Sequence, residues 1–190
     1  MKNLFYYLFT AMLMLASVVG FSQTNPVIEN IFNRKSVRAF TSKPVDKETL
    51  TLLVKAGMAA PSGMDRRPWD FVILDKREVM DSLAAKLPYA KMLKTAQAAI
   101  IIYGNPDKST YWYLDCSAAA QNILLAAESL GLGAVWTAAY PDQKRVEAVN
   151  SALKVPSPYI PLCVIPIGYP TGNFVPKDKW DPTRVHFNLW

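Results

Sequence analysis

Two stretches of the chain lie close together in sequence and carry most of its distinctive chemistry: Arg34-Lys35-Ser36-Val37-Arg38 and Ala60-Pro61-Ser62-Gly63-Met64-Asp65-Arg66-Arg67-Pro68-Trp69. In an extended segment residues two apart point to the same side, so Arg34, Ser36 and Arg38 would present two guanidinium groups and a hydroxyl on one face. This pattern predicts a site for a phosphate or another small anion. The alternative is that Arg34 and Lys35 close a preceding helix, whose C-terminus favours cations, while Arg38 is solvated.

Helices are predicted on either side of the first stretch. Residues 25–33 have apolar residues at helical spacing and Pro26 at a first-turn position. After Pro44, Asp46 can cap a second helix. Its apolar stripe is expected to be core and contains Leu50, Leu53, Val54, Gly57 and Met58. The small residues at 59–63 then end this helix in a turn where backbone can approach a flat ligand.

The remaining segments predict a mixture of strands and helices. Residues 70–74 and 98–103 indicate buried strands, and the three consecutive isoleucines of the second place it centrally, covered on both faces. Further strands are expected over residues 135–139 and 160–168, and helices over 76–87, 111–129 and 142–153, with a short helical continuation at 89–96. The glycines at 131 and 133 follow a helix and precede a strand, which excludes a dinucleotide-binding fingerprint.

The C-terminal tail has an alternating pattern. Val185, Phe187 and Leu189 alternate with polar residues, which predicts a strand that packs across a partner subunit.

Composition and charge restrict the possible partners. The chain has 190 residues, is 51% hydrophobic, and has a formal charge of +6 from 21 basic and 15 acidic residues. This fits one domain with a sizeable core. Because the basic residues are scattered apart from residues 34–38 and 66–67, we expect an anionic small molecule and no nucleic acid as the partner.

The first 22 residues read as a secretory signal peptide, with a basic start, an apolar middle and small residues at Gly20 and Ser22. We expect cleavage there, a domain over residues 23–190, and export to the periplasm. The alternative is an uncleaved segment that tethers the protein to the membrane, since the apolar run approaches the roughly 18 residues that can span a bilayer. Otherwise no stable membrane association is expected.

Several catalytic classes are excluded by the residues available. His186, the single histidine, lies in the tail, so catalytic triads and histidine metal sites are not expected. Cys116 and Cys163 are interpreted as core residues, with a disulfide as the alternative in an oxidising compartment. A cofactor is therefore the natural carrier of reactivity.

The motifs together resemble the nitroreductase family of FMN-dependent oxidoreductases. The resemblance runs from about residue 28 to residue 190 and includes, in order, the two opening stretches, the helix at 111–129, the segment 131–136, the strand end at 165–170 and a basic tail. It implies an α+β fold, with a mixed central sheet surrounded by helices, in an intertwined homodimer with two flavins at its interface.

The resemblance also implies the roles of individual residues. Arg34 and Ser36 would contact the FMN phosphate, and Arg38 would face the ribityl chain and the pyrimidine edge. The second subunit would place Pro61, Ser62, Gly63 and Met64 against the ring. Trp136, Thr137 and Ala138 would line the ring near its reactive nitrogen. Lys177 and Lys179 would form a second phosphate-binding pair, with Arg184 as an alternative.

Two residues depart from the pattern common in the family. Asp65 and Arg67 stand where many members have Asn and Gln. An ionised Asp only accepts hydrogen bonds, so we expect Asp65 to pair with Arg66 or Arg67, or to accept from a flavin N–H. Arg67 is a weaker site candidate. Trp69 is interpreted as core in preference to a ring-stacking residue.

The function implied is that of an FMN-dependent NAD(P)H oxidoreductase. It would take hydride from NADH or NADPH and pass two electrons, by a ping-pong mechanism, to a nitroaromatic, a quinone or a similar small flat acceptor, without a catalytic acid or base from the protein. Because reduced nicotinamides are cytoplasmic, one alternative is an exported flavin-binding or flavin-remodelling protein without nicotinamide turnover. A third possibility is an anion-binding domain without flavin.

Overall fold

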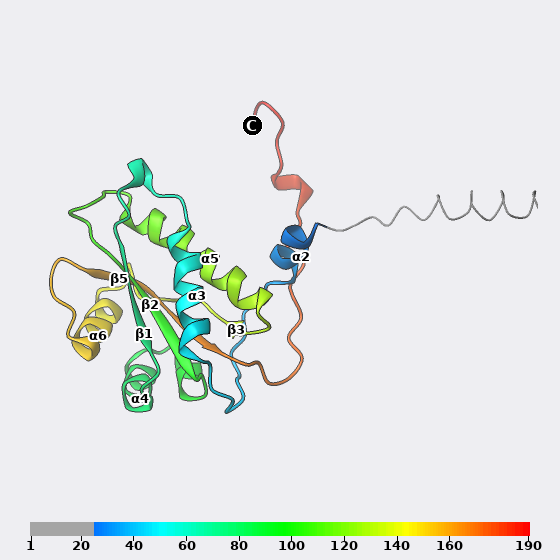
Figure 1. The fold of residues 1–190 in the computed structure, drawn as a ribbon. Helices are drawn as coiled ribbons and strands as arrows, with labels where there is room; N and C mark the ends of the chain where they lie inside the picture. Colours follow the sequence, from blue (N-terminus) through cyan, green and yellow to red (C-terminus); the bar gives the residue numbers. More distant parts are fainter. Residues whose placement is uncertain (1–24) are drawn as a thin grey trace, which may run out of the picture.

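A single antiparallel sheet with helices on both faces forms the body of the protein (Figure 1). The computed structural model describes residues 25–190, so the predicted signal segment lies outside the described residues. The strands pair in the order β1-β2-β5-β3, and β4 also pairs with β5. Their bounds are β1 Trp69–Leu74, β2 Ala98–Gly104, β3 Gly133–Ala134, β4 Thr137–Ala138 and β5 Ile160–Gly168.

The helices confirm the predicted α+β class. They are α2 Pro26–Asn33, α3 Lys47–Met58, α4 Arg77–Lys86, α5 Trp112–Ser129 and α6 Gln143–Leu153. Asn25, Asp46 and Asp142 accept hydrogen bonds from first-turn N–H groups of α2, α3 and α6, which explains where these helices begin. None of the helices in residues 25–190 is both long and apolar enough to cross a bilayer.

The central strand β2 separates two parts of the core. Ile100 and Ile102 pack with α3 and α5 on one face, while Ile101 and Tyr103 pack with α4 and α6 on the other. Because successive side chains of a strand point to opposite faces, all of β2 is buried, as the run of isoleucines predicts.

The sheet contains one parallel contact besides its antiparallel ladders. All the strand pairs are antiparallel, whereas the isolated bridge between Ser36 and Ala134 is parallel. Within residues 25–190 the predicted mixed sheet is therefore mixed through this bridge alone, which attaches residues 34–38 to the sheet beside β3.

Three local predictions required correction. Residues 89–96 form no full helix, because only Lys91–Lys94 makes a 3-10 turn. The predicted strand at 135–139 is divided into β3 and β4, with Val135 and Trp136 between them. The strand at 70–74 is present as β1 but is not fully buried, since it lies at the edge of the sheet and is paired on one side only.

Two apolar surfaces remain exposed in the single chain. No residue of α2 is buried, and Phe32 is 72% exposed. Met58, predicted as core, is 51% exposed. It is the last residue of α3 and lies outside the buried stripe of that helix, which consists of Leu50, Leu53 and Gly57. Within the single chain the tail has a 3-10 turn at Pro182–Arg184 and pairs with no strand after it, and its apolar side chains are exposed, so a strand that pairs with a partner subunit stays a prediction.

Candidate functional site

An open groove of about 950 Å³ lies where the start and the end of the described chain meet. Figure 1 shows α2 beside the C-terminal segment, and the groove runs between them. It brings together the three residues of the predicted anion-binding face, Arg34, Ser36 and Arg38, and the two lysines predicted as a second phosphate pair, Lys177 and Lys179. Phe32, Val175 and Trp180 contribute apolar surface to the same groove.

The extended segment 34–38 has the alternation that the sequence predicts. Val37 is 1% exposed, and its N–H donates to the carbonyl oxygen of Ala134 at 3.0 Å. Lys35 Nζ lies 2.6 Å from Glu128 Oε1 at the C-terminal end of α5. Because Lys35 and Val37 are held by the body of the protein, Arg34, Ser36 and Arg38 are presented on the opposite side of the segment, toward the groove.

The groove has an excess of positive charge. Among residues 25–190, no carboxylate forms an ion pair with Arg34, Arg38, Lys177 or Lys179. Asp178 is the acidic residue in the lining, and it accepts a hydrogen bond from the N–H of Trp180 at 3.0 Å. Two guanidinium groups with a neighbouring hydroxyl and two ammonium groups are suited to a phosphate.

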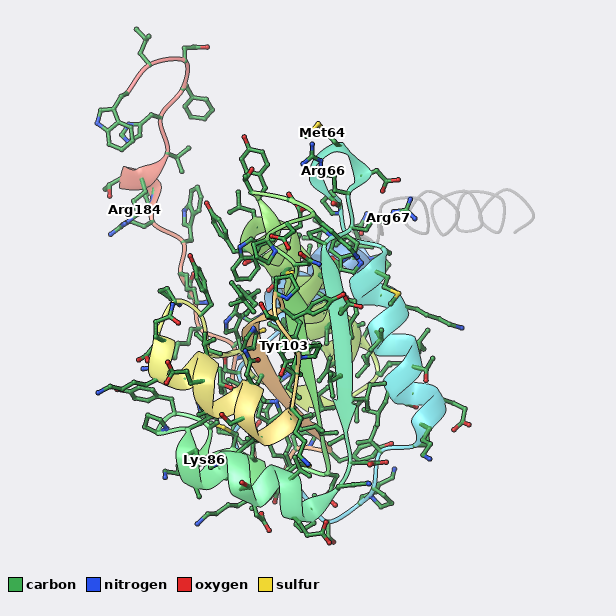
Figure 2. The ribbon with its side chains drawn as sticks, turned by 90° about the vertical axis from the view of Figure 1, so that its left-hand side faces the viewer. Met64, Arg66, Arg67, Lys86, Tyr103 and Arg184 are labelled. Atoms are coloured by element: carbon green, nitrogen blue, oxygen red, sulfur yellow. The ribbon has the colours of Figure 1, made fainter. Side chains whose placement is uncertain are left out.

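The loop after α3 has an unusual backbone. Met64, Asp65 and Arg67 have φ angles of 53°, 54° and 45°, in the left-handed region that side chains other than glycine rarely adopt. Arg67 makes a bidentate ion pair with Asp65, with distances of 2.6 and 2.5 Å. This pairing is one of those expected for Asp65, and it lowers the pKa of that carboxyl. Figure 2 shows Met64 and Arg66 at the tip of this loop, with Lys86 of α4 at the opposite end of the molecule.

Asp115 of α5, which the sequence analysis did not single out, anchors this loop by hydrogen bonds. Its carboxylate is buried, and the residue is 7% exposed. Its Oδ2 accepts from the Ser62 hydroxyl at 3.0 Å and its Oδ1 accepts from the Gly63 N–H at 3.1 Å. Ser62 Oγ in turn accepts from the Arg67 N–H at 2.9 Å. The available signal was an acid flanked by Leu114 and Cys116 in the first half of a helix whose first turn is largely aromatic and apolar.

The other predicted ring contacts lie at β4. Thr137 is buried and its hydroxyl donates to the carbonyl oxygen of Val164 at 2.6 Å, while Ala138 is exposed and Trp136 packs against the core. Neither residues 61–65 nor residues 136–138 line the groove within one chain. The structure therefore assembles the predicted phosphate residues but leaves the predicted ring contacts apart from them.

Comparisons with known proteins identify the family of the chain. The sequence profile of the nitroreductase family matches residues 31–87 and 75–169. The chain belongs to the nitroreductase family. A Methanothermobacter thermautotrophicus protein provisionally named NADH dehydrogenase/NAD(P)H nitroreductase is 41% identical over 167 residues, which covers 86% of this chain and 87% of that protein.

Two solved structures extend the comparison to the fold. A Bacteroides thetaiotaomicron protein with the same provisional name is 56% identical, with a TM-score of 0.87 over 88% of this chain and 100% of that one. A nitroreductase-like protein of Desulfovibrio desulfuricans, solved in complex with FMN, is 26% identical, with a TM-score of 0.77 over 88% of this chain and 99% of that one.

The geometry of the chain bears on three further predictions. Trp69 is 8% exposed and lies in the core, as predicted. Lys177 and Lys179 line the groove, whereas Arg184 pairs with Asp181 at 3.0 Å outside it, so the assignment of the tail lysines to the phosphate stays a prediction. Cys116 and Cys163 are buried free thiols. Burial, together with the nearby carboxylates of Asp115 and Asp70, raises the pKa of Cys116 to about 12.

Proposed function

We propose that this nitroreductase is an FMN-dependent NAD(P)H oxidoreductase that reduces nitroaromatic, quinone or similar flat acceptors by two-electron, ping-pong turnover. The observation that carries the proposal is the groove, in which Arg34, Ser36, Arg38, Lys177 and Lys179 converge and, within residues 25–190, no carboxylate forms an ion pair with any of these four cations. The names of the relatives and the FMN-containing structure support the same assignment.

The groove fits the phosphate of FMN better than it fits a carboxylate alone. A phosphate monoester has three acceptor oxygens and carries about −1.5 to −2 charges at pH 7. Arg34 can offer a guanidinium fork and Ser36 a hydroxyl, and Lys177 and Lys179 add point charges from the opposite wall. Phe32 and Trp180 provide apolar surface at the margin of the same groove.

A second copy of the chain would complete the site. The loop of residues 61–67 and the β4 residues lie outside the groove of their own chain, so contact between them and a flavin in that groove requires a partner subunit. The exposed apolar side chains of α2, together with those of the tail, are candidates for the interface, because monomers rarely expose large apolar patches. We therefore include a homodimer in the proposal.

The chemistry would rest on the cofactor and the electrostatics on the protein. FMN, when bound, supplies hydride acceptance and donation. Arg38 would stabilise negative charge at the pyrimidine edge, and Arg34 and Ser36 would fix the phosphate. Among residues 25–190, the groove lining contains no histidine or cysteine, and its one carboxylate is that of Asp178, which accepts a hydrogen bond from the N–H of Trp180. The proposal therefore assigns no proton transfer to a side chain of the groove.

Absorption spectroscopy tests this function. The purified full chain should show flavin bands that bleach on anaerobic addition of NADPH or NADH and return when a quinone or nitroaromatic is added. The double variant Arg34→Ala/Arg38→Ala should lose FMN, while the control Lys86→Ala, a cation at the far end of the molecule, should retain it (Figure 2).

Two outcomes would count against the proposal in different ways. A chain that stays colourless after FMN is supplied would refute FMN binding. Bands that persist with both nicotinamides would favour a second candidate, an exported flavin-binding protein without nicotinamide turnover. The observation that favours this candidate is the signal-like sequence of residues 1–22, since reduced nicotinamides are cytoplasmic.

A further inference from the structure

The buried carboxylate of Asp115 is not part of the groove, yet it makes the closest set of polar contacts to the loop 61–67. We propose that Asp115 is a positioning residue for the flavin. On this proposal Asp115 fixes the backbone of the loop by accepting from the Ser62 hydroxyl and the Gly63 N–H. The residues left to contact the flavin ring are then Pro61, Met64 and Asp65. The inference rests on the proposed function in one respect, namely that this loop faces FMN bound to the partner subunit.

The hydrogen-bond inventory of the loop supports this role. A serine hydroxyl has one proton to donate, and that of Ser62 is directed at Asp115 Oδ2 at 3.0 Å. The Ser62 oxygen is also engaged, because it accepts from the N–H of Arg67. The Gly63 N–H is directed at Asp115 Oδ1 at 3.1 Å. Neither the Ser62 hydroxyl nor the Gly63 N–H is therefore available to the flavin unless it leaves Asp115.

Exposure shows the same division between an inner and an outer side. Ser62 and Gly63 are half-buried, whereas Met64 is 74% exposed and Asp65 is exposed beside it. The expectation that residues 61–64 lie together against the ring is thus refined: two of them hold the loop and two face outward. Asp65, whose carboxylate is paired with Arg67, is presented on the outer side.

The backbone of the loop explains why such an anchor is needed. Met64, Asp65 and Arg67 all have positive φ angles, which an unrestrained chain would rarely populate together. Asp115 fixes the residues that precede this turn, and through Ser62 Oγ it also fixes the N–H of Arg67. The ion pair between Asp65 and Arg67 closes the turn from the outside.

The site requires a carboxylate and not simply a polar group. Two donors, one from a hydroxyl and one from the backbone, converge on the two oxygens of the same side chain. An asparagine has one acceptor oxygen, so its amide N–H₂ would face one of these donors. Asp115→Asn therefore preserves the shape of the side chain but breaks part of the anchor.

The test uses the FMN-free full chain and measures FMN affinity, local amide exchange and the visible circular dichroism of bound FMN. Asp115→Asn should weaken FMN binding about tenfold, as expected for a lost hydrogen bond to a charged group. It should also speed amide exchange within residues 62–67 and alter the dichroism of the bound ring at saturating FMN. Ser62→Ala should act in the same direction, and the double variant should lose less than the two single losses combined, because both disturb one contact.

The matched control is Asp81→Asn on α4, which carries the same chemical change on an exposed side chain. If Asp115→Asn has the same FMN affinity and the same flavin dichroism as this control, the proposal is overturned. Faster exchange throughout β2 and α5 would also overturn it, since that indicates a general structural role. If the wild-type chain binds no FMN, the proposed function fails, and unchanged exchange in residues 62–67 would separately refute the role of Asp115 in the loop.

Discussion

Substituting Gly133 by alanine should displace the segment that carries the predicted phosphate residues. A Cβ atom at position 133 would lie 2.5 Å from Val37 Cγ1, 2.7 Å from Val37 Cβ and 3.0 Å from Val37 Cγ2. Val37 cannot easily retreat, because it is buried and its N–H is bonded to the carbonyl oxygen of Ala134. Overpacking of this kind typically costs about 1–3 kcal/mol, and we expect Gly133→Ala to lose about 2 kcal/mol of unfolding free energy.

The effect on the groove follows from the position of Val37 between Ser36 and Arg38. A shift of this segment away from β3 moves the hydroxyl and the guanidinium groups relative to Lys177 and Lys179, so FMN affinity should fall together with stability. Urea unfolding would measure the stability, through a lower midpoint at an unchanged slope, and fluorescence titration would measure the affinity.

Gly57→Ala is the matched control for this prediction. Its Cβ would lie 3.0 Å from the flexible end of Ile123 and 3.3 Å from Phe71, in the core beneath α3. We expect a smaller loss of stability and no loss of FMN affinity in the folded protein. If Gly133→Ala kept wild-type stability and affinity, the tight contact between β3 and Val37 would not be what holds residues 34–38 in place.

Two further predictions concern titratable groups outside the groove. Cys116 and Cys163 are buried, and burial raises the pKa of both thiols. Neither thiol should therefore react with iodoacetamide at pH 8 until denaturant is added. Mass spectrometry would detect labelling of the native protein, which would contradict this prediction. Hydrogen bonds from the N–H and hydroxyl of Thr49 lower the pKa of Asp46 below its ordinary 3.8, so its contribution to stability is present above that pH and is lost as the pH falls through the lowered pKa. Asp46→Ala should therefore reduce stability more at pH 7 than at pH 2, and an equal loss at both pH values would contradict this account.

Local periodicity predicted the parts of the protein that local geometry controls. The alternation of residues 34–38 follows from extended backbone alone, and the burial of β2 on both faces follows from its continuous isoleucines. The same reasoning is not tested for the tail, where Val185, Phe187 and Leu189 alternate but the predicted strand would need the sheet edge of a partner subunit; within the described chain no sheet edge pairs with them, and Asn188 has a φ of 66°.

The missed part of the site depends on contacts between distant segments. Asp115 carries no periodic signal, and its importance appears only when α5 lies beneath the loop that begins at Pro61. Likewise, the choice between Arg184 and the two tail lysines could not be made from spacing. Within the described chain the turn after Lys179 pairs Arg184 with Asp181 and leaves the two lysines in the groove lining, a contact that spacing does not show.

The groove between residues 31–38 and 175–180 has a consequence for how the protein would respond to its ligand. A molecule held between these two walls acts as a noncovalent crosslink between segments that are far apart in the chain. Its binding free energy would add to the free energy needed to detach the C-terminal segment, in proportion to the logarithm of ligand concentration. Protection of that segment from proteases would thus report how much of the protein is loaded, independently of any catalytic assay.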